Sequence, residues 1–578
     1  MTDRPTPATL AALTGRHLDL VRAPFTLPSS RLIVFREGDG VRVHTSEYER
    51  RLAECRVLDS LTVRDASSRP IAITAVLPDR VVFGDGAATL VFAGPAALSL
   101  GASAPGFSAQ WTTPDGETRT APLAPAVRFD VAEDRSVRAE ASLTHEADAG
   151  AARALWREWF AACPVVRDDL QEMTAFCWWV LGANIVSLPR LRAQLGDVRA
   201  VVPSKIGYVG LWQWDAYFIA TGLRHGAPDL AREQLDLAFG FPSPNGQLPD
   251  VVHEEGVLAT SDDLPQADRD RLRRAGSQIA DPHAPVPLTK PPLAAWALRK
   301  VLEALPRTPD NHAWARRHLE TIRGSQDWWF ACSDLDGDGM PEYGHPYSSG
   351  LDDSPIFDGP LPTTAPDLGA YLVLQDLELA RFAEEYGDAD PDMHRERAQR
   401  TLAKLLELWV PTPPPDATGA SPGAPGRVGP ASAGVFRARA AGEPVASDAI
   451  VGLMPLLTGS LPSDITEALV AALDDPARYG TPWGLPTVAA GDPDFSPERM
   501  WRGPVWVNTN LLVAEGLEAS GRPDLARELA ERTVALVIHG GGPHEYFNPL
   551  TGEKAETATT AFGWSAALFV DLAVRLSA

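Results

Sequence analysis

The pattern of hydrophobic and polar positions divides the chain into a strand-rich part and a helical part. In the first part, from about residue 17 to 145, short apolar and β-branched runs are separated by Gly-Asp-Gly turns. Runs of this kind between turn residues are typical of strands in an antiparallel sheet. We therefore expect residues 1–148 to form a small antiparallel β-sandwich, an accessory domain. The runs are residues 31–35, 71–76 and 88–92, and the turns are residues 38–40 and 84–86.

From about residue 150 the apolar positions recur at helical spacing. The hexapeptide Pro-Asp-Leu-Ala-Arg-Glu occurs twice, at residues 228–233 and 523–528. Proline before an acidic first turn and an apolar period of about 3.6 residues indicates the start of a helix. Roughly twelve segments have this periodicity, and a repeated helical unit is typical of hairpin arrays. The pattern predicts a mainly α domain at residues 149–578, an α/α toroid, interrupted by a Pro/Ala/Gly-rich insertion near residues 411–430.

Composition and charge narrow the classes of function. The 578 residues are 44% hydrophobic and 22% charged, with a formal net charge of −24. This acidity argues against nucleic-acid and anionic-membrane partners. The N-terminus has no signal-peptide pattern and no apolar run is long enough to span a membrane, so we expect a cytoplasmic protein. Its four cysteines are too scattered for a disulfide framework or a zinc site: Cys55, Cys163, Cys177 and Cys332.

Four clusters combine aromatic side chains with carboxylates, Arg or Asn in turns expected between helices. Indole faces stack on pyranose rings, while carboxylates, guanidinium and amide groups supply directional hydrogen bonds to hydroxyls. Loops of this kind over a helical scaffold are suited to a carbohydrate pocket. The clusters lie at residues 210–218, 348–355, 500–510 and 544–552, the last followed by residues 562–565.

A glycosidic bond is cleaved by a pair of carboxyl groups, and two of the clusters offer a candidate each. Asp352 lies between Gly350 and Pro355, in a turn that can project its carboxyl group into a pocket. Glu545 follows a glycine-rich stretch that permits a close backbone approach. One carboxyl would protonate the leaving oxygen, and the other would attack the sugar or activate water.

These motifs resemble those of glycoside hydrolase family 63, which includes the processing α-glucosidase and the bacterial mannosylglycerate and glucosylglycerate hydrolases. The resemblance runs from about residue 205 to the C-terminus, with the motifs in the family's order. The matching motifs are Trp212-Gln213-Trp214-Asp215, Gly350-Leu351-Asp352-Asp353-Ser354-Pro355, Gly484-Leu485-Pro486-Thr487 with Trp501-Arg502-Gly503-Pro504, and Glu545-Tyr546-Phe547-Asn548-Pro549-Leu550-Thr551-Gly552 with Trp564-Ser565-Ala566.

The resemblance implies an (α/α)6 catalytic domain and hydrolysis with inversion at an α-linked anomeric carbon. Asp352 would be the general acid and Glu545 the general base. Asp353 could instead cap the turn or bond to its neighbour, and Glu342 has either a site role or a structural one. The residues expected to bind the sugar are Trp212, Trp214, Asp215, Glu342, Asp353, Trp501, Arg502, Trp506, Tyr546 and Trp564.

The sequence departs from the family's pattern at two places. Lys290 precedes Pro291 and Pro292 where the family pattern has Gln, and residues 553–560 are charged and Thr-rich instead of Gly-rich. Both departures suggest a different subsite for the aglycone. The leading prediction is an inverting α-glucosidase acting on a small soluble substrate; the alternatives are a mannosylglycerate or glucosylglycerate hydrolase, a glycoside phosphorylase, and a non-catalytic sugar-binding protein.

No cofactor is expected for this chemistry, but one segment resembles part of a calcium loop. Asp334, Asp336 and Asp338 alternate, and Gly339 stands at the sixth position. Calcium loops place oxygen ligands at alternate positions with glycine sixth and a carboxylate twelfth. The twelfth residue here is His345, so the pattern is incomplete and a tight turn that positions Asp352 is the alternative.

Overall fold

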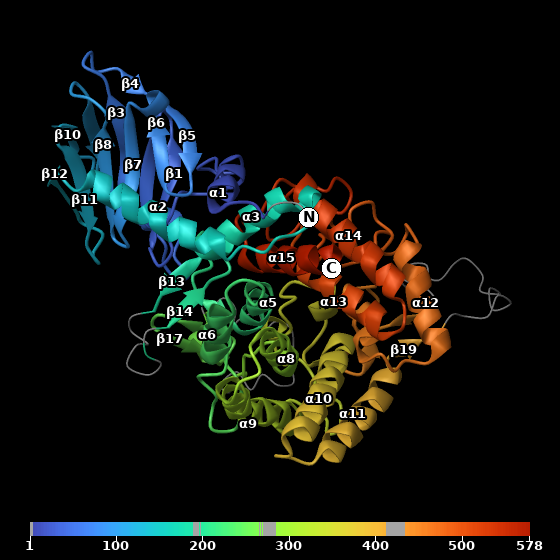
Figure 1. The fold of residues 1–578 in the computed structure, drawn as a ribbon. Helices are drawn as coiled ribbons and strands as arrows, with labels where there is room; N and C mark the ends of the chain where they lie inside the picture. Colours follow the sequence, from blue (N-terminus) through green and yellow to red (C-terminus); the bar gives the residue numbers. More distant parts are fainter. Residues whose placement is uncertain are drawn as a thin grey trace.

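The computed structural model describes residues 4–188, 196, 198–264, 266, 269, 285–411 and 434–578. Most strands gather at one side of the molecule and most helices at the other (Figure 1). The predicted insertion near 411–430 lies outside the described residues, apart from residue 411. In the described part of the chain, no helix is long and apolar enough to cross a membrane.

The strand-rich part consists of two six-stranded antiparallel sheets. The first has the order β1-β2-β3-β9-β10, with β4 paired to β3, and the second has the order β12-β11-β8-β7-β6-β5. Trp111 of β9 contacts Phe129 of β11 edge-on at 5.2 Å between ring centroids, so side chains of the two sheets pack together. The strands are β1 Leu32–Glu37, β2 Gly40–Thr45, β3 Arg56–Arg64, β4 Pro70–Ile71, β5 Ile73–Leu77, β6 Arg80–Phe83, β7 Ala88–Gly94, β8 Ala97–Ala102, β9 Ser108–Thr112, β10 Thr118–Pro122, β11 Ala126–Val131 and β12 Val137–Ser142.

The three strand-like runs predicted from the sequence are confirmed as parts of β1, β5 and β7. The first predicted turn is the two-residue connection of the β1–β2 hairpin, in which Glu37 pairs with Gly40. Gly38 has a φ of 56°, a conformation that glycine adopts without steric cost. The second predicted turn forms a short 3-10 segment between β6 and β7.

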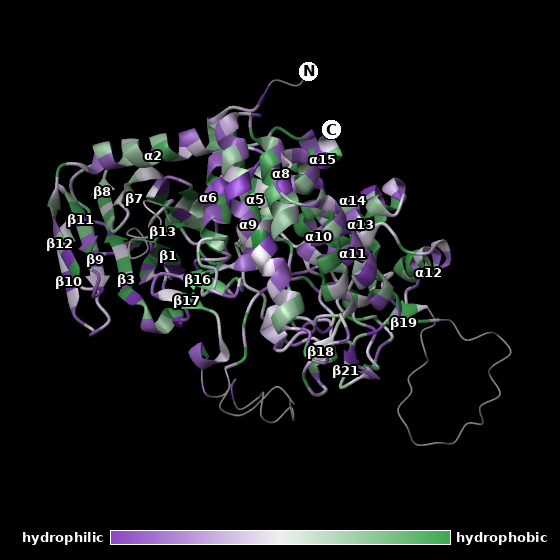
Figure 2. Cartoon of the chain, turned by 90° about the horizontal axis from the view of Figure 1, so that it is seen from below, coloured by the Kyte–Doolittle hydropathy of each residue, from purple (hydrophilic) through white to green (hydrophobic). Residues whose placement is uncertain are grey.

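Eleven α-helices follow residue 167 in the described part of the chain, together with the nine-residue 3-10 helix η8. Both copies of the repeated hexapeptide begin helices, α6 and α14, with proline in the first turn as predicted. Hydrophobic and hydrophilic residues alternate in bands along these helices (Figure 2). The α-helices are α1 Pro7–Gly15, α2 His145–Ala161, α3 Asp168–Ala183, α5 Gln213–Leu223, α6 Pro228–Ala238, α8 Ala294–Ala304, α9 Pro309–Cys332, α10 Pro366–Tyr386, α11 Pro391–Leu406, α12 Ser463–Asp474, α13 Val507–Ala519, α14 Pro523–His539 and α15 Gly563–Ser577; η8 spans Ile450–Thr458.

Six of these helices follow one another in a closed circuit of contacts. In order, α5 contacts α8, α8 contacts α10, α10 contacts η8, η8 contacts α13, α13 contacts α15, and α15 returns to α5. Another helix packs on each of five members: α6 on α5, α9 on α8, α11 on α10, α14 on α13 and α3 on α15. The member η8 contains Pro455, which lacks the N–H that an α-helical ladder requires.

The circuit is closed by the contact between α5 and α15. Gly222 allows this close approach, because a Cβ there would lie 2.3 Å from the carbonyl oxygen of Ala567. At the end of α5, Arg224 and His225 contact the fully buried Asp571 of α15 at 2.8 and 2.7 Å. These ion-paired contacts hold the pKa of Asp571 below its usual range despite burial.

Short two- and three-residue strands connect the helices and carry several site residues. The sheet β15-β16-β17 places Trp212 beside Val251, so the start of α5 is bound to the segment that follows Asp250. These strands are β13 Ile185–Ser187, β14 Arg199–Val201, β15 Leu211–Trp212, β16 Val251–His253, β17 Gly256–Leu258, β18 Thr363–Thr364, β19 Trp409–Val410, β20 Val435–Phe436, β21 Arg439–Ala440 and β22 Glu443–Pro444.

Candidate active site

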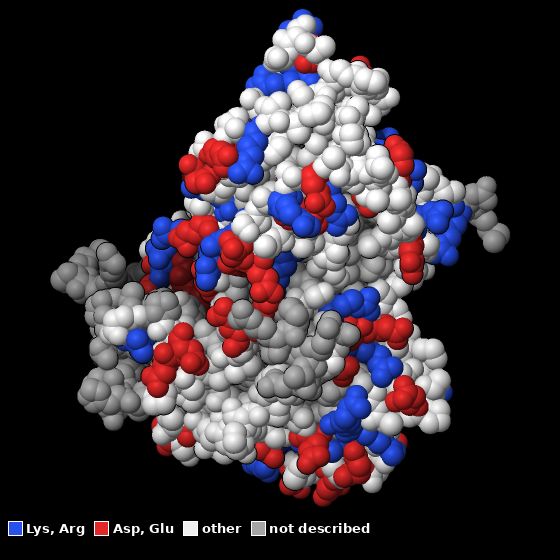
Figure 3. All heavy atoms as spheres, turned by 90° about the vertical axis from the view of Figure 1, so that its left-hand side faces the viewer, with Lys and Arg blue, Asp and Glu red and all other residues white. Residues whose placement is uncertain are grey.

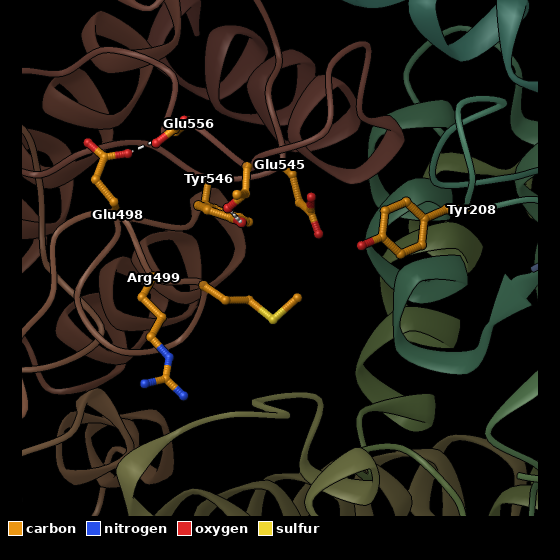
Figure 4. A pocket seen from close by; sticks show the side chains of 8 residues that line it. Tyr208, Glu498, Arg499, Glu545, Tyr546 and Glu556 are labelled. Atoms are coloured by element: carbon orange, nitrogen blue, oxygen red, sulfur yellow. Dashed lines mark hydrogen bonds between the residues drawn. The ribbon is translucent and has the colours of Figure 1, made fainter. Parts of the chain in front are cut away.

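A cavity of about 400 Å³ brings together three segments that are far apart in the sequence. Glu545 and Tyr546 of the predicted site line it, and Tyr208 faces Glu545 across it (Figure 4). Carboxylates outnumber cations among the residues of its wall. The lining residues are Tyr208, Glu498, Arg499, Met500, Glu545, Tyr546, Glu556 and Thr557.

Glu545 is a buried carboxyl group that accepts the backbone N–H of Thr559 at 2.9 Å. Its own N–H donates to the carbonyl oxygen of Thr559, which fixes the local backbone. The residue is 4% exposed, and burial raises the pKa of Glu545 to about 7 although the Thr559 N–H and the hydroxyl groups of Thr559 and Tyr208 favour the carboxylate. The group can therefore gain or lose a proton near neutral pH.

Asp352 lies in a turn that its neighbours define. Gly350 ends a short 3-10 helix (η5, Pro346–Ser349) with a φ of 72°, and a second one (η6, Pro355–Phe357) begins three residues after Asp352. Asp352 is half-buried and is not among the residues lining the cavity. Its charge nevertheless acts on Tyr208, whose pKa is raised by burial, then by Glu545 and Asp352. Both predicted catalytic carboxyl groups therefore influence the same tyrosine.

Asp353 binds protein groups on the opposite loop. One oxygen accepts the N–H of Trp501 at 2.9 Å, and the other accepts Arg499 Nε at 3.1 Å. These bonds join the turn that carries Asp352 to the loop that lines the cavity. Asp353 thus bonds to another segment, a role that differs from the two alternatives of capping its own turn and bonding to its neighbour.

Five aromatic side chains, from the starts of α5 and α15 and from the loops before α13 and α15, form one cluster beside the cavity. Trp501 and Trp506 stack with ring centroids 3.7 Å apart, and Trp506 also contacts Tyr546 at 4.7 Å. Trp564, at the start of α15, contacts Trp214 at 5.5 Å. Each of these five side chains is buried, so the cluster holds the starts of α5, α13 and α15 together. Trp212 is less buried and lies 5.8 Å from Tyr208 between ring centroids.

A buried lysine and its carboxylate partner lie near the start of α5. Lys290 contacts Asp250 at 2.9 Å and donates to the carbonyl oxygen of Tyr347 at 2.6 Å. Burial alone would lower the pKa of Lys290, but the charges of Asp250, Asp352 and Asp215 raise it. Burial raises the pKa of Asp215 well above its ordinary value, while the charge of Lys290 opposes that rise. Lys290, at the position where the resemblance implied glutamine, is therefore part of the electrostatics around Asp215 and Asp352.

Two of the predicted sugar-binding residues contact other groups. The guanidinium of Arg502 pairs with Asp358 and is 11% exposed. Glu342 accepts the hydroxyl of Thr364 at 3.2 Å, lies near Asp334 and Asp336, and is not among the residues that line the cavity. Burial, then the charge of Asp336, raises the pKa of Glu342 to about 7.

Sequence reasoning missed Tyr208 and Asp250. Tyr208 stands four residues before the Trp212 motif, in a Gly-Tyr pair that no periodicity distinguishes. Asp250 follows Pro249 in a loop and is one of many loop acids in the sequence. Both residues reach the site through contacts between segments that are distant in the sequence, and no local sequence pattern predicts such contacts.

Comparison with known proteins identifies the family. The family described as "Mannosylglycerate hydrolase MGH1-like glycoside hydrolase domain" matches residues 208–565. The chain belongs to glycoside hydrolase family 63. It is therefore an enzyme that acts on an O-glycosyl bond. The family match begins at Tyr208 and includes every residue that lines the cavity, while β1–β12 precede it.

Similar members of the family act on glycosylglycerates, according to their names. The mannosylglycerate hydrolase of Thermus thermophilus is 29% identical over 422 residues, which cover 64% of this chain and 95% of that protein. Mannosylglycerate hydrolase MGH1 of Selaginella moellendorffii is 28% identical over 64% of this chain and 80% of its own. The glucosylglycerate hydrolase of Mycolicibacterium hassiacum is 26% identical over 65% of this chain and 94% of its own.

Solved structures agree with the family and extend the fold comparison. A family 63 mannosylglycerate hydrolase of Thermus thermophilus, in complex with Tris and D-glycerate, matches with a TM-score of 0.52 and 25% identity, covering 64% of this chain and 95% of its own. A bacterial glucoamylase complexed with acarbose has the same TM-score at 10% identity and covers 96% of this chain and 93% of its own. The second likeness concerns the fold alone, and it includes the strand-rich part.

Proposed function

We propose that the protein is an inverting hydrolase of a small α-linked glycoside of the mannosylglycerate or glucosylglycerate type. The observation that carries the proposal is the buried Glu545 in the cavity wall, facing Tyr208, whose pKa is raised by the charges of both Glu545 and Asp352. Relatives named as hydrolases of these two glycosylglycerates match over 64–65% of this chain. They support this alternative better than the α-glucosidase that the sequence analysis placed first.

In this mechanism Glu545 is the general base and Asp352 the general acid. Thr559 N–H and the Tyr208 hydroxyl stabilise the Glu545 carboxylate, the form that accepts a proton from the attacking water. Asp352 in its protonated form would donate to the glycosidic oxygen as the bond to the anomeric carbon breaks. Inverting pairs stand about 6.5–9.5 Å apart, because a water molecule must fit between base and sugar. A water attack opposite the leaving group inverts the α-configuration to β.

The sugar would bind against the aromatic cluster at the starts of α5, α13 and α15. We assign Trp212, Trp214 and Tyr546 to ring contacts, and Asp215 to hydroxyl groups as a hydrogen-bond partner. Asp353 is a positioning residue in this scheme, since it joins the Asp352 turn to the Trp501 loop. The other proposed contacts of the subsite are Trp501, Arg502, Trp506 and Trp564.

The proposed architecture is an (α/α)6 toroid at residues 149–578 preceded by a β-sandwich at residues 1–148. The closed circuit of six helices supports the toroid, and the contact between Trp111 and Phe129 supports the sandwich. Site residues precede or begin α5, α10, α13 and α15, as they would if one end of a toroid formed the pocket.

A proton NMR assay tests the proposal. The purified enzyme is mixed with α-mannosylglycerate, α-glucosylglycerate and α-linked glucosyl and mannosyl disaccharides, first without phosphate and then with it. Initial release of the β-anomer from a glycerate would support inverting hydrolysis and name the sugar. Initial α-anomer would contradict the base role of Glu545, turnover only with phosphate would indicate a phosphorylase, and preference for a glucosyl disaccharide would restore the α-glucosidase.

The same assay separates the roles of the two carboxyl groups. Asp352→Asn and Glu545→Gln should each lower the rate by roughly 10²–10⁴-fold, the usual effect of losing a general acid or base. Asp310→Asn is the control, because Asp310 is a strongly exposed aspartate in the first turn of α9 and is not among the proposed site residues. Full activity in either catalytic variant would refute its role.

A further inference from the structure

A second cavity, of about 180 Å³, lies where the segment after α1 meets α3 and the loop that precedes Glu545. Its lining shares no residue with the cavity that Glu545 lines. Two contacts join its walls: His17 stacks on Phe176 with ring centroids 4.7 Å apart, and the Thr560 hydroxyl donates to the carbonyl oxygen of Arg22. The polar residues of the wall are Arg16, His17, Asp19, Arg22 and His544.

His544 is the observation that points to a ligand. The residue is 2% exposed, and its Nε2 lies 3.0 Å from the carbonyl oxygen of Gly540. A carbonyl oxygen can only accept, so Nε2 carries the proton of this hydrogen bond. The other ring nitrogen, Nδ1, is buried and has no hydrogen-bond partner within the described residues. Buried polar atoms in proteins are normally satisfied, so we expect a group from outside the chain at Nδ1.

The protonation state of His544 defines what that group must be. Burial, opposed by the hydrogen bond to Gly540, lowers the pKa of His544 to about 4, and the charges of Arg22 and Lys554 lower it further. The ring is therefore neutral near pH 7. With its proton on Nε2, a neutral imidazole has a lone pair on Nδ1 and can only accept there. The ligand must therefore bring a hydrogen-bond donor to His544.

Arg22 supplies a cation to the same cavity. Its side chain is exposed and makes no hydrogen bond or ion pair in the part of the chain that the structure describes. The guanidinium lies over the glycine-rich loop, because a Cβ on Gly541 would be 3.7 Å from Arg22 Nη1. A guanidinium group binds carboxylates in a bidentate geometry. Arg22 can therefore hold an anion at this cavity.

The other charged groups of the wall are already bound within the protein. Arg16 pairs with Glu172 at 2.6 Å, and His17 Nε2 lies 3.2 Å from the same carboxylate. Asp19 Oδ1 accepts the backbone N–H groups of residues 21–23 at 2.7–3.2 Å, and hydrogen bonds of this kind stabilise its charge. These contacts leave the guanidinium of Arg22 to a ligand.

We propose that this cavity binds a small hydroxycarboxylate anion, with its carboxylate on Arg22 and its hydroxyl group donating to Nδ1 of His544. The volume admits a molecule of a few carbon atoms. A carboxylate matches the guanidinium fork, and a hydroxyl group of the same molecule supplies the donor that the imidazole requires. His544 directly precedes Glu545, so the ligand would lie beside the proposed base without entering the cavity that Glu545 lines. The site is independent of the proposed function.

Calorimetric titration of the full chain with three-carbon probes tests the site without measuring turnover. L-lactate and 3-hydroxypropanoate carry both groups, propanoate lacks the hydroxyl, and 1,2-propanediol lacks the carboxylate. We expect one hydroxycarboxylate per chain, and about tenfold or more weaker binding of propanoate and of the diol. No saturable binding of either hydroxycarboxylate below about 10⁻² M would overturn the proposal, as would equal affinity for propanoate.

Two variants and a control locate the ligand. Arg22→Gln should weaken lactate binding by about tenfold or more, and Arg22 is exposed, so its replacement should leave folding intact. His544→Phe should remove the preference for hydroxycarboxylates over propanoate, because it keeps a ring and loses the acceptor. Arg36→Gln, at an exposed arginine of β1 outside the cavity wall, should bind as the unaltered protein does.

The Arg22 variant decides the assignment. Unchanged affinity in Arg22→Gln, with the fold verified by circular dichroism, would refute it, as would an equal loss in Arg36→Gln. A loss confined to Arg22→Gln would also separate this cavity from the one that Glu545 lines, since Arg22 is not part of that wall.

Discussion

Replacing Tyr208 by Phe removes one hydroxyl group from the cavity and leaves the ring in place. That hydroxyl faces the Glu545 carboxylate and lowers its pKa, so it favours the ionised form of the base. A hydrogen bond to a charged group contributes about 1.5–3 kcal/mol, and one pKa unit corresponds to about 1.4 kcal/mol. The pKa of Glu545, about 7 with the hydroxyl present, should therefore rise by about 1–2 units in Tyr208→Phe.

The sign of the kinetic effect follows from the role of Glu545. A general base acts as its carboxylate, so the ascending acid limb of the profile of kcat/KM against pH reports its pKa. The limb should move about 1–2 pH units toward alkaline pH, with roughly 5–50-fold less activity near pH 7 and partial recovery at higher pH. Rates of sugar release from the preferred substrate, measured from acid to alkaline pH, provide the test.

Tyr546→Phe is the matched control for this experiment. Its hydroxyl also lies at the cavity but bonds to the Thr557 hydroxyl at 2.8 Å and not to Glu545. Its acid limb should stay near that of the unaltered enzyme. An acid limb that does not move in Tyr208→Phe, or moves equally in both variants, would refute the reasoning.

Three further predictions follow from the described contacts. Glu545→Gln should stabilise the fold at pH 8 by up to about 3 kcal/mol. The pKa of Glu545 in the folded protein, about 7, exceeds its unfolded value, so the cost of burying the carboxylate grows as the pH rises from about 4.5 to 7. Denaturant unfolding of both proteins at pH 5 and pH 8 checks this, and an equal effect of the substitution at the two pH values would contradict it. Gly350→Ala should lower activity and thermal stability together, since its Cβ would lie 2.1 Å from the Trp214 indole at a φ of 72°; unchanged kcat/KM and melting temperature would contradict this. Asp571→Asn should destabilise the protein by about 3–5 kcal/mol, because Arg224 loses its buried partner; a calorimetric loss below about 1 kcal/mol would contradict it.

Local patterns account for the parts of the fold that were predicted. The runs that became β1, β5 and β7, and the hexapeptides that began α6 and α14, depend on residues adjacent in sequence. The relation of Glu342 to Asp334 and Asp336 depends instead on how the chain returns on itself after α9. The sequence left Glu342 either a site role or a structural one, because its separation of ten residues from Asp352 does not say which groups the side chain contacts. Although the chain has a net charge of −24, acidic and basic side chains are interspersed over the face shown in Figure 3.

The site depends on residues whose meeting is set by tertiary contacts. The pairing of Lys290 with Asp250, and of Tyr208 with Glu545, joins loops from separate helical hairpins. The departure of Lys290 from the family pattern marked its position as unusual, but its partners were invisible before the structure. The partner of Asp353 could not be predicted either, because the backbone N–H that it accepts belongs to Trp501, which is far along the chain.

The contact of α15 with α5 has a consequence for how the protein is made. Helix α15, which completes the circuit, lies far along the chain from α5, and its Asp571 is the buried partner of Arg224 and His225. A nascent chain can form the strands and early hairpins as they leave the ribosome, yet the circuit cannot close before α15 has been synthesised. The inner faces of the earlier helices stay uncovered until then, and such non-local closure is slow. A chain that terminates before Glu545 would thus have an exposed apolar interior and no Glu545, and it would be a substrate for chaperones and proteases instead of a partially active enzyme.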